Sequence, residues 1–248
     1  ATAGALMNGV LRWMGTPAPT KAQWKQLWIL SIFMVLLSNG MVNVAQQEVS
    51  SGLAAVAVAS MPLWAAFFAF MKGERPSNKE WLGLAVGFAG VVWLNAGSAL
   101  SASPLGMFAL FLAPLAWAWG SIWSRWRDLP APFMSAAGQM LAGSVWMLGA
   151  AVVTGERITE WPTLTATSAL VYLMAFGSII GFTAYIWLLN NVRPALATSY
   201  AYVNPLIAVV LGVLIAGERF DRHEIGAMVV ILLGVLIITV SRTRRKSA

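Results

Sequence analysis

Neutral polar side chains are the groups in this 248-residue sequence whose types and spacing could bind a solute. Asn39, Asn43, Gln46 and Gln47 follow one another at i, i+4, i+7 and i+8, which places them on one face of a helix. An amide without hydrogen-bond partners in hydrocarbon costs several kcal/mol, so we expect this face to point into a bundle of helices. Hydrogen bonds between neighbouring helices would explain the face as well as a binding site would.

The segment Thr198–Pro205 (TSYAYVNP) has the highest density of polar side chains in any apolar stretch. Pro205 cannot donate a backbone hydrogen bond and its ring collides with the preceding turn, which predicts a kinked helix or a freed carbonyl. Tyr200 and Asn204 share one face of this helix. Tyr202 and Pro205 share another. We expect one of the two faces to line a cavity, because membranes tolerate freed carbonyls only against protein or water.

Three further residues belong to the same hypothesis. Pro62 matches Pro205 in an earlier apolar stretch and is expected to bend its helix equally. Trp117 could stack on an aromatic or cationic solute, although packing explains it as well, and Gln139 lies in the middle of the next stretch. The candidate substrate pathway therefore comprises Asn39, Asn43, Gln46, Pro62, Trp117, Gln139, Tyr200, Tyr202, Asn204 and Pro205.

Ionisable side chains are absent from the long apolar stretches, where they would be the default candidates for a proton relay. Proton coupling would need Glu48, at the outer boundary of one stretch, or a residue of the helix expected to be missing. The sequence has no cysteine, and its single histidine, His223, has no partners for a metal site. An integral-membrane enzyme would need clustered Asp, Glu, His or Ser, so we predict no catalytic residues, no metal and no cofactor.

The elements that carry these residues are membrane spans. Apolar residues make up 59% of the chain and charged residues 10%, whereas a soluble domain has about a quarter charged residues. A helix needs about 20 apolar residues to cross a bilayer, and β-barrel strands would alternate apolar with polar positions. The sequence therefore predicts an all-α integral membrane fold with spans at Leu27–Val44, Leu53–Met71, Trp81–Ala99, Leu105–Trp123, Phe133–Val153, Leu170–Leu189, Ala195–Ala216 and Ile225–Val240.

The positive charge predicts the orientation of these spans. If the basic tail after Ser241 lies in the cytoplasm, thirteen of the 16 Lys and Arg residues fall on the cytoplasmic side of the alternating spans. This asymmetry is the one that membrane proteins follow. The net charge of +7 thus reflects topology, and we predict contact with lipid and a small-molecule substrate but not with nucleic acid. The sequence leaves the oligomeric state open, a homodimer included.

An internal repeat relates the two halves of the chain. Leu53 and Pro62 match Leu196 and Pro205 at a constant offset of 143, and Glu74-Arg75 matches Glu218-Arg219 at an offset of 144. The predicted topology places the two copies in opposite orientations, which requires an odd number of helices in each half. We expect a first repeat over residues 1–100 that lacks one helix and part of another, a second over 101–242 and a basic tail over 243–248. Inverted repeats are typical of secondary transporters, although a duplication without transport is the alternative.

Four strings carry a family resemblance: SNGMV from Ser38, SGLAA from Ser51, GSII from Gly177 and, most distinctively, PALATSYAYVNP from Pro194. At these residues the chain resembles the EamA group of the drug/metabolite transporter superfamily. The resemblance implies ten helices in two inverted five-helix bundles, both ends in the cytoplasm and a bacterial inner-membrane location. It also implies peripheral fifth helices at Trp81–Ala99 and Ile225–Val240, and export of metabolites, amino acids or xenobiotics.

Overall fold

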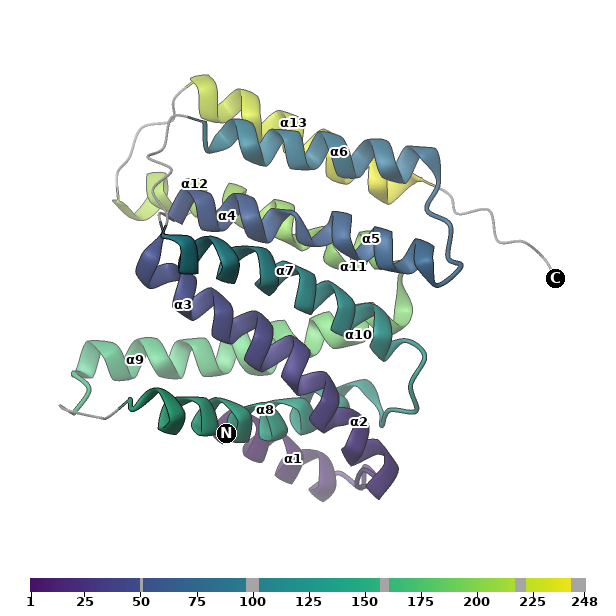
Figure 1. The fold of residues 1–248 in the computed structure, drawn as a ribbon, viewed down its shortest axis with the longest axis vertical. Helices are drawn as coiled ribbons and strands as arrows, with labels where there is room; N and C mark the ends of the chain where they lie inside the picture. The colour runs from purple at the N-terminus through teal and green to yellow at the C-terminus, as the bar shows by residue number, and fades with distance from the viewer. Residues whose placement is uncertain (50, 97–102, 157–160, 217–221, 242–248) are drawn as a thin grey trace. The chain divides into compact units, whose positions relative to one another are not determined.

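The computed structural model describes the chain except for residues 50, 97–102, 157–160, 217–221 and 242–248 (Figure 1). Every regular element of the described residues is helical. The elements are α1 (Thr2–Trp13), α2 (Lys21–Ser31), η1 (Ile32–Gly40), α3 (Met41–Glu48), α4 (Ser51–Ala59), α5 (Met61–Met71), α6 (Asn78–Leu94), α7 (Pro104–Ser124), α8 (Pro132–Thr154), α9 (Leu164–Tyr172), η2 (Leu173–Phe182), α10 (Thr183–Asn191), α11 (Pro194–Thr198), α12 (Tyr200–Ala216) and α13 (Arg222–Val240).

Six helices of the described residues are long and apolar enough to cross a membrane. They cover Lys21–Gln47, Leu53–Met71, Pro104–Ser124, Pro132–Thr154, Leu164–Asn191 and Arg222–Val240. Each overlaps one of the predicted spans, which confirms the helical membrane fold. The first 14 residues contain the helix α1.

Two predicted spans are shorter than expected. The span predicted at Trp81–Ala99 is α6, which begins at Asn78 and ends at Leu94, while its predicted end lies outside the described residues. The side-chain amide of Asn95 donates to the Val91 carbonyl at 2.9 Å, in competition with the helix ladder. The span predicted at Ala195–Ala216 is interrupted at Ser199, so that α11 and α12 are separate helices.

Local signals set where several helices begin and end. The hydroxyls of Thr20 and Ser77 accept from the backbone N–H three residues on, and Gln23 and Glu80 reciprocate, so α2 and α6 each begin with a capping box. Helix α8 begins with a proline in its first turn and ends at Gly155, whose φ of 73° is the left-handed conformation that glycine adopts without strain.

Two of the membrane helices contain long π-helical segments in their middle. Segment η1 joins α2 to α3, and η2 joins α9 to α10. Backbone hydrogen bonds in a π-helix run from i to i+5, and such segments are rare and frequent at functional sites. Neither segment contains a proline or a charged residue, so the sequence predicts ordinary α-helices there.

The chain forms two compact units that each combine parts of both sequence halves. The first unit contains residues 1–40 and 123–191, and α8 is its central helix, in contact with α1, α2, η1 and α10. A Cβ at Gly138 would lie 2.6 Å from Leu27 Cδ1, so the Leu27 side chain packs directly against this glycine where α2 meets α8. Trp28 and Trp146 meet edge to face at 5.5 Å, and the Trp146 indole donates to the Trp28 carbonyl at 3.2 Å.

The second unit contains residues 41–122 and 192–248, and its most extensive contact joins α6 to α13. These two helices lie side by side and antiparallel (Figure 1), with Gly83 against Ile238 and Gly90 against Ile231. A Cβ at Gly234 would overlap the backbone of Gly87. Small residues let helix backbones approach this closely in membranes, so these glycines serve the packing of α6 against α13.

Candidate functional site

Two interrupted helices form the centre of the second unit. Helix α4 gives way to α5 at Ser60, and α11 gives way to α12 at Ser199. At both breaks the serine hydroxyl donates to the carbonyl three residues back, at 2.6 Å from Ser60 to Ala57 and at 2.9 Å from Ser199 to Leu196. Such bonds compete with the helix ladder and bend helices. The same device thus interrupts both helices.

The interrupted helices cross each other in opposite directions. Helix α11 contacts α5, and α12 contacts α4, so the start of one helix lies against the end of the other (Figure 1). Helix α7 adds a third side, because Ala118 and Ile122 belong to one buried cluster with Ala65 and Ala201. Half-buried aromatic side chains border this cluster: Trp64, Phe68, Trp117 and Tyr200.

The two repeat-related prolines, Pro62 and Pro205, lie at different distances from the helix breaks. Pro62 is buried in the first turn of α5, where a helix needs no backbone donor, and the interruption comes just before it. Pro205 lies inside α12, and the interruption comes six residues earlier, at Ser199. A serine hydroxyl therefore marks each break, and the equal bending expected of the two prolines stays a prediction.

Tyr202 packs inside the protein. Its side chain is fully buried between α12 and α6, and its hydroxyl donates to the Leu84 carbonyl at 3.0 Å. A Cβ at Gly87 would lie 2.8 Å from the Tyr202 ring, so the glycine provides the space for the tyrosine. With its hydroxyl bonded in this way, Tyr202 fixes α12 to α6, which favours a packing role over the place in the pathway that the sequence predicted.

The opposite face of α12 is accessible. Tyr200 is half-buried and Asn204 is exposed, one turn apart. Asn204 has no hydrogen-bond partner among the described residues, so its amide is available to a polar group outside the helix. Of the two faces that the sequence left open, the one with Tyr200 and Asn204 is therefore the candidate for solute contact.

The amide face predicted in the first complete span is exposed as well. Asn39, Asn43 and Gln46 all have exposed side chains. Asn39 is in addition bonded within its own helix, where its amide donates to the Met34 carbonyl at 3.0 Å in the π-helical segment η1. Exposed amides on a membrane helix require polar surroundings, because hydrocarbon offers them no partner.

Gln139 is fully buried in α8, in the first unit. Its amide nitrogen donates to the Ser135 hydroxyl at 3.1 Å, one turn earlier. Its amide oxygen has no partner in the described part of the chain. The pair Ser135–Gln139 is a buried polar contact in the first half of α8, and the place of Gln139 in the pathway stays a prediction.

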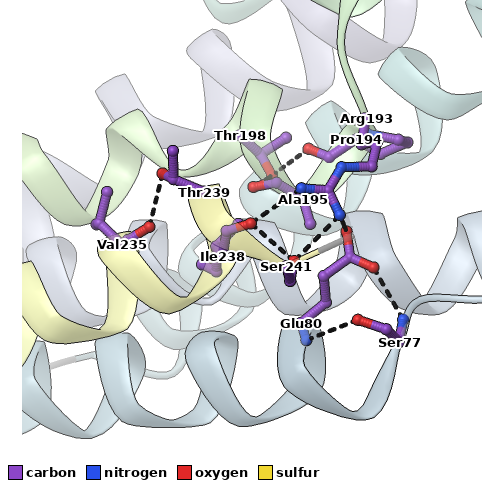
Figure 2. A network of polar contacts seen from close by, with 10 residues as sticks. All are labelled: Ser77, Glu80, Arg193, Pro194, Ala195, Thr198, Val235, Ile238, Thr239 and Ser241. Carbon is purple, nitrogen blue, oxygen red and sulfur yellow. Dashed lines mark hydrogen bonds and ion pairs between the residues drawn. The ribbon is translucent and has the colours of Figure 1, made fainter. Parts of the chain in front are cut away.

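One charged network escaped the sequence analysis. Arg193, just before α11, donates to Glu80 at 2.6 Å and to Ser241 at 3.1 Å, and Glu80 accepts from the Ser77 backbone at 2.8 Å (Figure 2). Glu80 is 2% exposed, although the predicted span began one residue after it. The spacing Ser-x-x-Glu before an apolar run is the signature of a capping box and could have pointed to this acid.

These side chains are suited to binding rather than to bond-making chemistry. Amides and hydroxyls both donate and accept hydrogen bonds, and the half-buried aromatic rings offer apolar contact. No group of three or more His, Cys, Asp or Glu that could hold a metal ion occurs in the described ranges. Such a lining fits neutral or zwitterionic solutes.

The apolar helices and the neutral polar side chains together define a polytopic helical membrane protein. The chain belongs to the EamA-like transporter family, whose family model matches residues 1–96 and 104–240. It is 39% identical to the inner membrane transporter YedA of Escherichia coli strain K12, over 97% of this chain and 79% of that protein.

More distant relatives and a solved structure agree with this assignment. The chain is 22% identical to the transporter YoaV of Bacillus subtilis, over 91% of this chain and 79% of the relative. It is 23% identical to protein PecM of Dickeya dadantii, over 94% and 80%. A crystal structure with 20% sequence identity has the same fold, with a TM-score of 0.79 over 98% of this chain and 85% of that one. The predicted family resemblance and the helical fold are thus confirmed.

The Tyr202 hydroxyl provides a direct test of packing. We expect Tyr202→Phe to lower the free energy of unfolding by about 1 kcal/mol, because it removes the buried hydrogen bond from the Tyr202 hydroxyl to the Leu84 carbonyl. Thermal unfolding of the detergent-solubilised protein measures this loss. Flux is expected to stay unchanged, and a flux loss without a stability loss would return Tyr202 to the pathway.

Proposed function

We propose that the protein is a secondary transporter of the bacterial inner membrane that exports small metabolites, amino acids or xenobiotics by alternating access between inverted repeats. The observation that carries the proposal is the pair of interrupted helices, α4–α5 and α11–α12, which occupy corresponding places in the two family matches. Discontinuous helices in both halves are where transporters of this kind bind their solutes, near the bilayer midplane.

The names of the relatives support the location. YedA is named an inner membrane transporter, and we extend that location to this chain. The distribution of basic residues supports a cytoplasmic C-terminus. The solute's contacts come from the accessible face of α12 with Tyr200 and Asn204, from the exposed amides Asn43 and Gln46, and from the half-buried Trp117.

The energy source follows from the charges of the spans. A charge at the bilayer centre costs about 2.5–3.5 kcal/mol even on the lenient insertion scale, so it is retained only where it is used. The described acids of the helices lie near helix ends, as Glu80 and Glu224 do in the first turns of α6 and α13. Transport is therefore driven by the solute's own gradient or by exchange, without a proton site in the spans.

A reconstitution experiment tests this proposal. Protein in proteoliposomes is screened with radiolabelled amino acids and other small metabolites, first at equal internal and external pH and then with an imposed pH gradient. We expect the same flux under both conditions. Accumulation that appears only with the pH gradient and survives Glu48→Gln would show a proton site outside the predicted spans.

Two other functions have different expected results. A membrane scaffold or receptor would bind partners but give no flux for any solute above protein-free liposomes. An integral-membrane enzyme would convert the solute instead of releasing it unchanged. Chemical analysis of the solute recovered after uptake separates the three functions.

A further inference from the structure

Arg193 joins the ends of three helices in the second unit. Its guanidinium donates to Glu80 in the first turn of α6, to the Ser241 hydroxyl after α13, and at 3.0 Å to the Ile238 carbonyl (Figure 2). Arg193 is itself the residue that precedes α11. The planar guanidinium is suited to three such bonds, because its donors form a fixed fork.

The partners of Arg193 include a buried carboxylate and a carbonyl at a helix end, which are groups that need hydrogen-bond donors. The Ile238 carbonyl lies in the last turn of α13, where the helix offers it no backbone donor, and it accepts from the Ser241 hydroxyl at 2.8 Å as well as from Arg193. The Glu80 side chain is 3% exposed. A buried carboxylate is expensive unless it is paired and hydrogen-bonded, so Glu80 holds Arg193 in place. The contact is thus a defined attachment, distinct from a solvated surface pair.

An arginine stands at this position of the repeat in one copy of the sequence only. The offset of 144 places Glu224 opposite Glu80, but the offset of 143 places Ser50, which lies outside the described residues, opposite Arg193. At the other end of the α6–α13 pair the described contact is an edge-to-face pair of Trp93 and His223 at 5.7 Å. The sequence therefore supplies an arginine of this kind to one end of the pair.

Helix α11 has five residues and begins directly after Arg193. The Ala197 N–H donates to the Arg193 carbonyl at 2.8 Å, and the Thr198 hydroxyl donates to the Pro194 carbonyl at 2.8 Å. The break at Ser199 follows directly, and Tyr200 begins α12. A displacement of Arg193 would therefore be transmitted through one rigid turn to the break and to the accessible face of α12.

We infer that Arg193 is a positioning residue for transport, which holds α11 to the α6–α13 pair so that the three move together when the helix break at Ser199 changes shape. This inference rests on the proposed transport function. Because Arg193 acts on the movement and not on the solute, its loss affects the maximal rate of transport and leaves the apparent affinity unchanged.

Transport kinetics test the inference on the purified, reconstituted protein. The probe is the radiolabelled amino acid that the wild-type protein transports fastest. Arg193→Gln is expected to lower the maximal rate per folded protein by about tenfold, with KM unchanged within about twofold. Glu80→Gln removes only one of the three partners of Arg193, so a smaller loss is expected, and the double variant is expected to lose no more than Arg193→Gln alone.

Two matched variants separate the attachment from general stability. Arg193→Lys keeps the charge but lacks the fork, so an intermediate rate is expected. Ser77→Ala removes the hydroxyl cap of α6 and leaves the Arg193–Glu80 pair, so it is expected to lower the melting temperature without lowering the rate. A raised KM at unchanged maximal rate in Arg193→Gln would overturn the inference, because it would make Arg193 a solute ligand.

Hydrogen–deuterium exchange provides a readout that needs no substrate. Arg193→Gln is expected to speed amide exchange in residues 194–199, whereas Ser77→Ala speeds it at the start of α6 only. Unchanged exchange at 194–199 would overturn the inference whatever the flux. If the wild-type protein transports no solute but Arg193→Gln loosens α11, the attachment is real and it is the transport proposal that fails.

Discussion

Replacing Gly234 with leucine is expected to prevent α13 from packing against α6. A Cβ at this position would overlap the backbone of Gly87, and backbone cannot move aside as a flexible side chain can. Overpacking a core costs about 1–3 kcal/mol where side chains can adjust, and more where they cannot. We therefore expect Gly234→Leu to lose at least about 3 kcal/mol, a large part of the roughly 5–15 kcal/mol that stabilises a folded domain.

The yield and melting temperature of the solubilised protein measure this effect. Gly149→Leu is the matched control, because a Cβ at Gly149 on α8 meets no atom within 4 Å. This control is expected to behave as the wild type does. A Gly234→Leu protein that melts at the wild-type temperature would mean that α6 and α13 do not approach at these glycines.

Asn204→Leu is expected to lower flux by about tenfold while the amount of folded protein stays unchanged. The leucine removes an exposed amide that has no partner among the described residues. A hydrogen bond to a polar solute is worth about 1–1.5 kcal/mol, and a difference of about 1.4 kcal/mol is a factor of ten. Initial uptake of the fastest amino acid into proteoliposomes measures the change.

The control for this change is a second exposed asparagine. The amide of Asn190 donates to the Ile186 carbonyl of its own helix at 2.7 Å, so Asn190→Leu removes a similar side chain without removing a free amide. Its flux is expected to match the wild type. Equal losses in both variants would assign the effect to the apolar substitution itself, and Asn204 would no longer be a pathway residue.

The membrane helices were predictable because hydrocarbon restricts what an apolar stretch can be. The stretches at Leu105–Trp123 and Phe133–Val153 lie inside α7 and α8 as the structure has them. The interruptions at Ser60 and Ser199 were not predictable, because a serine in an apolar stretch either leaves the helix straight or bends it through one hydrogen bond to the preceding turn. That choice depends on neighbouring helices, which a single sequence does not specify.

The candidate site was predictable as a set of faces but not as a set of contacts. Helical spacing places Tyr202 and Asn204 on different faces of the helix, and in the structure Tyr202 is buried and Asn204 is exposed. What decided between them was Gly87, more than a hundred residues away in the chain, which provides space for the tyrosine ring. Long-range complementarity of this kind leaves no trace in local periodicity.

Glu80 was overlooked for a different reason. The predicted span Trp81–Ala99 begins directly after Glu80, whereas in the structure Glu80 lies in the first turn of α6. Glu80 can be buried at a helix end because it pairs with Arg193, which lies 113 positions later in the sequence.

The π-helical segments η1 and η2 allow two membrane helices to lose one residue without a change in the direction of the side chains that follow. Each turn of a π-helix holds an additional residue, so the loss of one residue from such a segment can be absorbed by a return to i to i+4 bonding. The side chains that follow then keep their direction. The same loss within the uninterrupted α8 would rotate every later residue by about 100° and turn its small-residue face away from α2. Evolutionary insertions and deletions within membrane helices of this protein are therefore expected to gather in η1 and η2.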